Sequence, residues 1–181
     1  MLVVIDYGMG NLHSVQKALK RLGVESKVSS SENDIEAAER LILPGVGHFK
    51  NGMDNLRRSG LDNLLNKKVL QDKTPILGIC LGMQLFTKSS EEGNAAGFGW
   101  INAETVKFNV VNNKEKIKIP HMGWNNLSIK KSGYITEEIT PDDLFYFVHS
   151  YFVKCNNPAD VLSTTNYGVE FVSSFQCENI T

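Results

Sequence analysis

Residues 74–86 read T-P-I-L-G-I-C-L-G-M-Q-L-F, and this stretch decides the fold. The apolar run Ile76–Ile79 is short enough to be a buried strand, and helix-forming residues follow Cys80. Gly78 and Gly82 each stand two residues from Cys80, as is needed where a nucleophile sits on a sharp turn and its neighbours must be small. The spacing predicts a nucleophile elbow that carries a cysteine.

Such a joint would also supply chemistry to Cys80. The free N–H groups at the start of the following helix favour a thiolate, so we expect them to lower the pKa of Cys80. The backbone N–H of Leu81 would form one half of an oxyanion hole. The spacing alone leaves a second interpretation open, because a small buried cysteine at a glycine-rich strand end has the same pattern.

Composition sets the broad class of the protein. The 181 residues are enough for one domain, residues 1–181, with a sizeable core. Three widely spaced cysteines form neither a disulfide framework nor a metal-binding pattern, so we expect a cytoplasmic protein without a metal or a cofactor. A net charge of −1 argues against nucleic acid, and no apolar run is long enough for a membrane span.

The first half of the chain alternates between short apolar runs and helical periodicity. Four runs predict strands, and helical segments lie between them, the longest interrupted at Ser59-Gly60; the expected strands are Leu2–Ile5, Val24–Val28, Leu41–Leu43 and Ile76–Ile79. Ser31 and Asp34 resemble a helix cap before a helix at Ile35–Arg40. Alternating strands and helices predict a parallel sheet with helices on both faces, in which sites lie at the carboxyl ends of the strands.

Two glycine-containing turns follow strands in this half. In P-G-V-G, residues 44–47, the glycines around Val46 would let the backbone turn its N–H groups inward, although this segment taken alone favours an ordinary glycine-rich turn. Gly8 and Gly10 invite a dinucleotide-binding interpretation, but His13 stands where a third glycine would be needed. A tight turn with a helix cap fits that segment better.

After residue 93 the pattern changes to alternation, which is typical of strands. The expected strands are Ile101–Phe108, Lys116–Ile119, Leu127–Lys130, Phe145–Val153 and Val169–Phe175, and the lysines between Lys114 and Lys118 would form the solvated face of one of them. The predicted fold class is therefore α/β: an open, mostly parallel twisted sheet with helices on both faces and an antiparallel extension in the second half.

Four motifs in this order carry a resemblance to a known family: P-G-V-G, G-I-C-L-G-M-Q, P-H-M-G-W-N and F-V-H-S-Y. The chain resembles the class I, or triad, glutamine amidotransferases. Within them it is most similar to glutaminase subunits that serve a two-protein synthase of histidine biosynthesis. The resemblance runs from the opening V-I-D-Y-G-M-G-N-L to the last residues.

The resemblance implies a function for each motif. Cys80 would attack the side-chain amide of L-glutamine and form a thioester, which water hydrolyses to glutamate. The resemblance assigns Val46, Gly47 and Leu81 to the oxyanion hole, Gln84 and Glu92 to binding glutamine, and His149, Ser150 and Tyr151 to the border of the same pocket. The oxyanion loop of the family can turn its peptide away until a partner binds, so a preformed hole is not expected.

The partner implied is a (β/α)8-barrel synthase subunit, which would receive the ammonia and form a heterodimer with this chain. The matching interface residues are Pro120, His121, Met122, Gly123 and Trp124, which we expect in a loop between two strands. Without the resemblance, a core position for Trp124 would be equally compatible with the sequence.

The chain departs from the family pattern at its end. The family takes its catalytic base and the orienting carboxylate from a Q-F-H-P-E-K-S-like segment, and the sequence stops at Thr181 before any such segment. From the residues alone, His149 would be the favoured base, but the resemblance assigns it elsewhere. We therefore expect a truncated and inactive form of a glutaminase. A paralogue that feeds another synthase, such as one amidating a nucleotide-linked sugar, and a non-catalytic binding module remain open.

Overall fold

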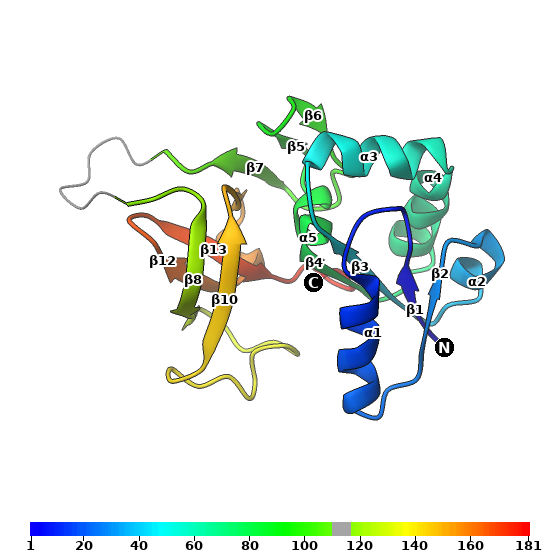
Figure 1. The fold of residues 1–181 in the computed structure, drawn as a ribbon, viewed down its shortest axis with the longest axis horizontal. Coiled ribbons are helices and arrows are strands. Elements are labelled where there is room, and N and C mark those ends of the chain that lie inside the picture. Colours follow the sequence, from blue (N-terminus) through cyan, green and yellow to red (C-terminus); the bar gives the residue numbers. More distant parts are fainter. Residues whose placement is uncertain (110–116) are drawn as a thin grey trace.

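The computed structural model describes residues 1–109 and 117–181 (Figure 1). Its first half is built on a parallel four-stranded sheet with the strand order β2-β1-β3-β4. The strands are β1 (Leu2–Ile5), β2 (Ser26–Ser29), β3 (Arg40–Gly45) and β4 (Ile76–Cys80). β1 and β3 are apolar runs with mostly buried side chains, as a sheet covered on both faces requires. In β4 only Ile76 is buried, whereas Ile79 and Cys80 are exposed, so the buried strand predicted at Ile76–Ile79 is confirmed as a strand but not as fully buried.

The helices connect these strands in chain order. They are α1 (Leu12–Arg21), α2 (Glu32–Glu36), α3 (Phe49–Arg58), α4 (Leu61–Asn66) and α5 (Leu81–Leu85), and α4 continues into a π-helical turn at Lys67–Gln71. Right-handed crossovers place α1 on one face of the sheet and α2, α3 and α4 on the other, where α4 contacts both α2 and α3 (Figure 1). The predicted helix break is confirmed, since Gly60 adopts φ +74° between α3 and α4.

Among the described residues, one large hydrophobic cluster contains side chains from both halves of the molecule. It contains strand residues of the parallel sheet, the inner sides of α3, α4 and α5, and residues from the second half, among them Val3, Ile5, Leu41, Leu43, Phe49, Met53, Leu56, Leu61, Leu65, Phe86, Ala103, Val153 and Phe175. Helix α1 contributes no fully buried side chain and covers its face of the sheet only partly.

The second half is mainly antiparallel. A seven-stranded sheet has the order β6-β5-β7-β11-β13-β12-β9, and a separate two-stranded ribbon pairs β8 with β10. The bounds are β5 (Ser89–Ser90), β6 (Ala95–Ala96), β7 (Ala103–Lys107), β8 (His121–Asn126), β9 (Ser128–Ile129), β10 (Leu144–His149), β11 (Tyr151–Cys155), β12 (Val161–Asn166) and β13 (Glu170–Phe175), with a 3₁₀ turn at Pro158–Asp160. The predicted fold class is confirmed.

Several predicted elements differ from the structure. The segment Phe145–Val153, predicted as one strand, is two strands that separate at Ser150 and enter different sheets. Residues 117–119 belong to no strand, and the rest of the predicted lysine-rich face lies outside the described residues. The helix expected at Ile35–Arg40 ends at Glu36, because Arg40 already pairs with β1 as the start of β3.

The last residues run parallel to β4. Ile180 forms a bridge with Ile76, and Thr181 both donates its N–H to the Ile76 carbonyl (3.0 Å) and accepts from the N–H of Gly78 (2.7 Å). The carboxyl end of the chain therefore lies beside the strand that ends in Cys80 (Figure 1). Within the described ranges, no helix combines the length and the apolar character that crossing a bilayer requires.

Candidate active site

Cys80 occupies the sharp turn that the sequence predicts. It is the last residue of β4 and directly precedes α5, with φ +56° and ψ −111°. A residue other than glycine rarely adopts a positive φ, and such strain is concentrated at functional sites. The neighbouring strand β3 brings Gly45 opposite Cys80 in register, so the P-G-V-G segment meets the cysteine at one edge of the sheet.

The two glycines beside Cys80 are required by close packing. A Cβ on Gly82 would lie 1.7 Å from the carbonyl oxygen of Leu43, and one on Gly78 would lie 2.6 Å from the backbone nitrogen of Met83. Backbone atoms cannot move aside as a side-chain tip can. The predicted reason for the glycine spacing is therefore confirmed.

The expected acidity of Cys80 is not found. The residue reaches solvent, but the protein atoms packed around its thiol raise its pKa by desolvation. The N–H of Leu81 donates to the sulfur and lowers the pKa, and the charge of Glu92 raises it again, so the net shift is upward. Desolvation outweighs the end of a helix that has only five residues. A thiol of this kind is protonated at neutral pH and needs a base.

The P-G-V-G segment ends β3 at Gly45 and continues outward. A Cβ on Gly45 would lie 2.9 Å from the Leu81 Cβ, so β3 and the elbow touch at this point. The Val46 side chain is 56% exposed, and Gly47 adopts φ +107°. The residues assigned to the oxyanion hole, Val46, Gly47 and Leu81, thus lie around one corner of the sheet.

Glu92 lies near Cys80, whereas Gln84 is directed toward β11. The Glu92 carboxylate accepts a hydrogen bond from the N–H of Phe49 (2.7 Å) and so caps α3, directly after P-G-V-G. Gln84, on α5 and 8% exposed, donates its side-chain Nε2–H to the carbonyl of Tyr151 (3.1 Å). That bond joins the elbow helix to β11.

His149, Ser150 and Tyr151 lie where β10 ends and β11 begins. His149 Nδ1 is 2.9 Å from the Tyr151 carbonyl, and its Nε2 is 3.1 Å from Nδ1 of His121. Burial lowers the pKa of His149, so the neutral ring predominates at pH 7. Both ring nitrogens have partners other than Cys80, which argues against His149 as its base.

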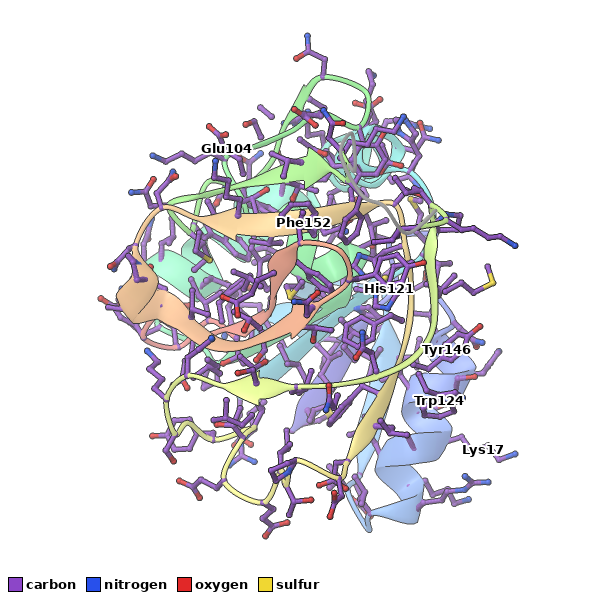
Figure 2. The ribbon with its side chains drawn as sticks, turned by 90° about the vertical axis from the view of Figure 1, so that its left-hand side faces the viewer. Lys17, Glu104, His121, Trp124, Tyr146 and Phe152 are labelled. Atoms are coloured by element: carbon purple, nitrogen blue, oxygen red, sulfur yellow. The ribbon has the colours of Figure 1, made fainter. Side chains whose placement is uncertain are left out.

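The P-H-M-G-W-N segment is not the loop that the sequence predicts. His121–Asn126 forms β8 and pairs with β10 residue by residue, with Pro120 directly before it. The side chains alternate: His121 is buried, whereas Met122 is 61% and Trp124 68% exposed. Trp124 packs against Tyr146 of β10 with ring centroids 5.5 Å apart (Figure 2). The interpretation of Trp124 as a core residue is therefore wrong.

Sequence reasoning missed Tyr7, which follows β1 and lies beneath the elbow. Its hydroxyl is only 2.3 Å from where a Cβ on Gly45 would be, and it has no hydrogen-bond partner among the described residues. Desolvation, and after it the charge of Cys80, raise the pKa of Tyr7, so the phenol stays protonated. The D-Y-G sequence at a strand end was the available signal, since the ends of parallel neighbours meet at one edge.

Comparisons with known proteins agree with this geometry. The family model "Glutamine amidotransferase class-I" matches residues 3–178. The imidazole glycerol phosphate synthase subunit HisH 2 of Methanococcus maripaludis is 48% identical over 180 residues, which are 99% of this chain and 88% of that protein. HisH 2 of Pseudomonas aeruginosa is 45% identical over 180 residues, with the same coverage of both proteins. HisH 1 of Campylobacter jejuni is 45% identical over 181 residues.

Solved structures resemble the fold at low sequence identity. A glutamine amidotransferase structure has a TM-score of 0.68 at 18% identity and covers 95% of this chain and 88% of its own. A glutamine amidotransferase from Thermotoga maritima has a TM-score of 0.66 at 14% identity and covers 99% of this chain and 72% of its own. The fold, the match over nearly the whole chain and the identity to the HisH subunits place this chain in the class I glutamine amidotransferase family.

Proposed function

We propose that the chain belongs to the glutaminase subunit of a two-protein synthase, folded as one amidotransferase domain, and that this subunit hydrolyses L-glutamine to glutamate and ammonia through a thioester on Cys80 once a base reaches that thiol. The observation that carries the proposal is the placement of Cys80. It is held at φ +56° between a strand and a helix, opposite Gly45 of the P-G-V-G segment. A strained, glycine-flanked cysteine beside a second backbone segment suits acyl transfer better than packing alone.

The reaction has two halves. The Cys80 thiolate attacks the amide carbon of glutamine, and backbone N–H groups of the oxyanion-hole residues, Val46, Gly47 and Leu81, stabilise the negative oxygen. The tetrahedral intermediate then expels ammonia, which takes up a proton as the C–N bond breaks, and leaves a thioester. Water attacks the thioester, and glutamate leaves with return of the thiol.

The remaining residues would hold the substrate. With its Nε2–H engaged by Tyr151, Gln84 presents its Oε1 as an acceptor, which suits an amide or ammonium donor. One oxygen of Glu92 is engaged by Phe49 and the other suits the α-amino group of glutamine. The turn formed by His149, Ser150 and Tyr151 would border the pocket with its backbone.

A glutamine-like diazo-ketone should modify Cys80 alone among the three cysteines. Burial, followed by the charge of Asp160, raises the pKa of Cys155 to about 12 and raises that of Cys177 as well, and neither lies at the elbow. Because the pKa of Cys80 is also raised, its labelling should keep accelerating as the pH rises past about 8.5, the usual thiol pKa. Peptide mapping by mass spectrometry measures both results. Equal modification of all three cysteines contradicts the proposal.

The proposed partner is a (β/α)8-barrel synthase subunit, and the proposed pathway is histidine biosynthesis in the cytoplasm. Support comes from the relatives, which are named as subunits of imidazole glycerol phosphate synthase. A second candidate is a paralogue that supplies ammonia to another acceptor, such as a nucleotide-linked sugar.

Replacing Trp124 by alanine should weaken association with the barrel by on the order of 2 kcal/mol, because a large exposed aromatic side chain is a common interface hot spot. The affinity of the chain and of its variant is measured by titration calorimetry against two barrels, an imidazole glycerol phosphate synthase barrel and a sugar-amidating one. The barrel that binds the unaltered chain tightly and the Trp124→Ala variant more weakly identifies the pathway. The thermal unfolding of the isolated chain should not change. Binding to neither barrel contradicts the partner assignment.

A further inference from the structure

A continuous chain of hydrogen bonds runs from the β8-β10 ribbon to the helix of the nucleophile elbow. His121 Nδ1 on β8 lies 3.1 Å from Nε2 of His149, whose Nδ1 lies 2.9 Å from the Tyr151 carbonyl oxygen. The same carbonyl accepts from Nε2 of Gln84 on α5 at 3.1 Å. Four residues from four elements are thus joined without a gap.

The donor and the acceptor of each hydrogen bond in this series follow from the Tyr151 carbonyl oxygen. A carbonyl oxygen only accepts, so His149 must carry its proton on Nδ1 and Gln84 must turn its NH₂ group toward Tyr151. The Nε2 of neutral His149 then has a free lone pair, and His121 must donate its own Nδ1–H to it. Both histidines are therefore Nδ1–H tautomers.

The surroundings keep these rings neutral and in place. His121 is stacked between Phe147 and Tyr167, with ring centroids 4.8 Å and 4.0 Å away. His149 packs edge-on against Phe108 and Phe171. Desolvation lowers the pKa of His121 to about 4, and burial lowers that of His149, so at pH 7 neither ring is charged. Neutral rings held by these contacts fit a single pattern of donors.

The β8-β10 ribbon, where this series of hydrogen bonds begins, also carries the exposed aromatic residues. His121 stands opposite His149 in the register of β8 and β10, and Trp124 stands opposite Tyr146 in the same ladder. Because side chains alternate along a strand, β8 turns Trp124 outward and His121 inward (Figure 2). A shift of the ribbon would therefore be transmitted to the position of the His121 ring.

We propose that His121 and His149 are positioning residues, which fix the side-chain amide of Gln84 through the Tyr151 carbonyl and so couple the partner-facing ribbon to the glutamine site. The role of Gln84 in binding glutamine rests on the proposed function, whereas the hydrogen-bond chain itself does not. The bond to Tyr151 fixes which way the Gln84 amide is turned, with its NH₂ group toward that carbonyl, and the two histidines hold the same carbonyl and its strand end.

Nitrogen-15 NMR of the histidine side chains tests the chain of bonds without any substrate. At pH 7 both His121 and His149 should show a protonated Nδ1 and an unprotonated Nε2. An Nε2–H tautomer of His149 would overturn the proposal, because such a ring cannot donate to the Tyr151 carbonyl. No substitution is needed, so this result does not depend on the stability of a variant.

A matched pair of variants separates hydrogen bonding from packing. His121→Phe keeps an aromatic ring between Phe147 and Tyr167 but removes the Nδ1–H. Tyr167→Phe keeps its own stacked ring and removes only a hydroxyl that donates to the Lys118 carbonyl. The NMR chemical shifts of the Gln84 side-chain amide should change in His121→Phe and stay the same in Tyr167→Phe. Equal shifts in both variants, or in neither, would overturn the coupling.

The glutamine site provides a second readout. With a diazo-ketone glutamine analogue, His121→Phe should raise the concentration needed for half-maximal labelling of Cys80 by about 2- to 10-fold, the worth of one lost hydrogen bond, and leave the maximal rate unchanged. A lower maximal rate with unchanged half-saturation contradicts a positioning role. If the unaltered chain is not labelled at all, the proposed function fails, and the NMR results still decide on the coupling.

Discussion

A Gly82→Ala variant should lose about 3 kcal/mol or more of its unfolding free energy and should no longer hold Cys80 at the elbow. Gly82 lies inside α5, where alanine by itself is favoured over glycine by roughly 1 kcal/mol. Here the added Cβ would meet the Leu43 carbonyl oxygen at 1.7 Å. Relieving that overlap moves β3 away from α5 and leaves buried backbone groups unpaired, a cost that exceeds the helical gain.

Gly52→Ala is the matched control, since it makes the same chemical change inside α3. Its Cβ would meet methyl groups of Leu85 at 3.3 Å, and a side-chain methyl can move by a few tenths of an ångström. This variant should be neutral or slightly stabilised in urea unfolding. Equal stability of the two variants would show that the elbow tolerates a larger residue and that the close packing at Gly82 is not essential.

The elbow could be predicted from the sequence because its residues are contiguous. The strand end, the positive φ of Cys80 and its two small neighbours all fall within Gly78–Gly82, although the backbone that Gly82 approaches belongs to Leu43 of β3. The alternation of strands and helices is local as well, and it fixes a parallel sheet through the handedness of crossovers. Together these local rules are enough to place Cys80 and the P-G-V-G segment at the same edge of the sheet.

The features that sequence reasoning missed depend on contacts between distant segments. The side chains of β8 alternate as those of any strand do, but the partner strand β10 is distant in the sequence, so the P-H-M-G-W-N pattern by itself favoured a loop. The break at Ser150 arises because two different sheets take the two halves of one apolar run. No local pattern indicates which sheet a strand will join.

The acidity of Cys80 was misjudged for a related reason. The start of a helix is visible in the sequence, but the number of atoms that gather around the thiol is not. Burial then raises the pKa more than the Leu81 N–H lowers it. The bond between His121 and His149 was missed in the same way, because it joins positions 28 residues apart.

Glutamine hydrolysis by this site should depend on a base that reaches Cys80 from beyond Thr181. A raised pKa leaves the Cys80 thiol protonated at neutral pH, and the ammonia that departs must also receive a proton. His149 is occupied by the Tyr151 carbonyl and by His121, and no histidine among the described residues donates to or accepts from Cys80. We therefore predict that hydrolysis needs a proton carrier other than the histidines of residues 1–109 and 117–181.

The course of the last residues shows how a base could arrive. Ile180 pairs with Ile76, and Thr181 accepts from Gly78, so the chain advances along β4 in the direction of Cys80. Residues added after Thr181 in the same direction would pass the carboxyl end of β4. We expect a His-Pro-Glu segment placed there to bring an imidazole to the Cys80 thiol and an acidic side chain behind it.

The most direct test of this mechanism is glutamate release, measured side by side for the 181-residue polypeptide and for one extended by a His-Pro-Glu segment, each with its barrel partner. We expect no measurable release from the first and restored release from the second, a difference of about 10⁴-fold or more, since removing a base from such a triad costs that much. Cys80→Ser should abolish the restored activity. Substantial release by the 181 residues that disappears in His149→Ala would contradict the mechanism and identify His149 as the base.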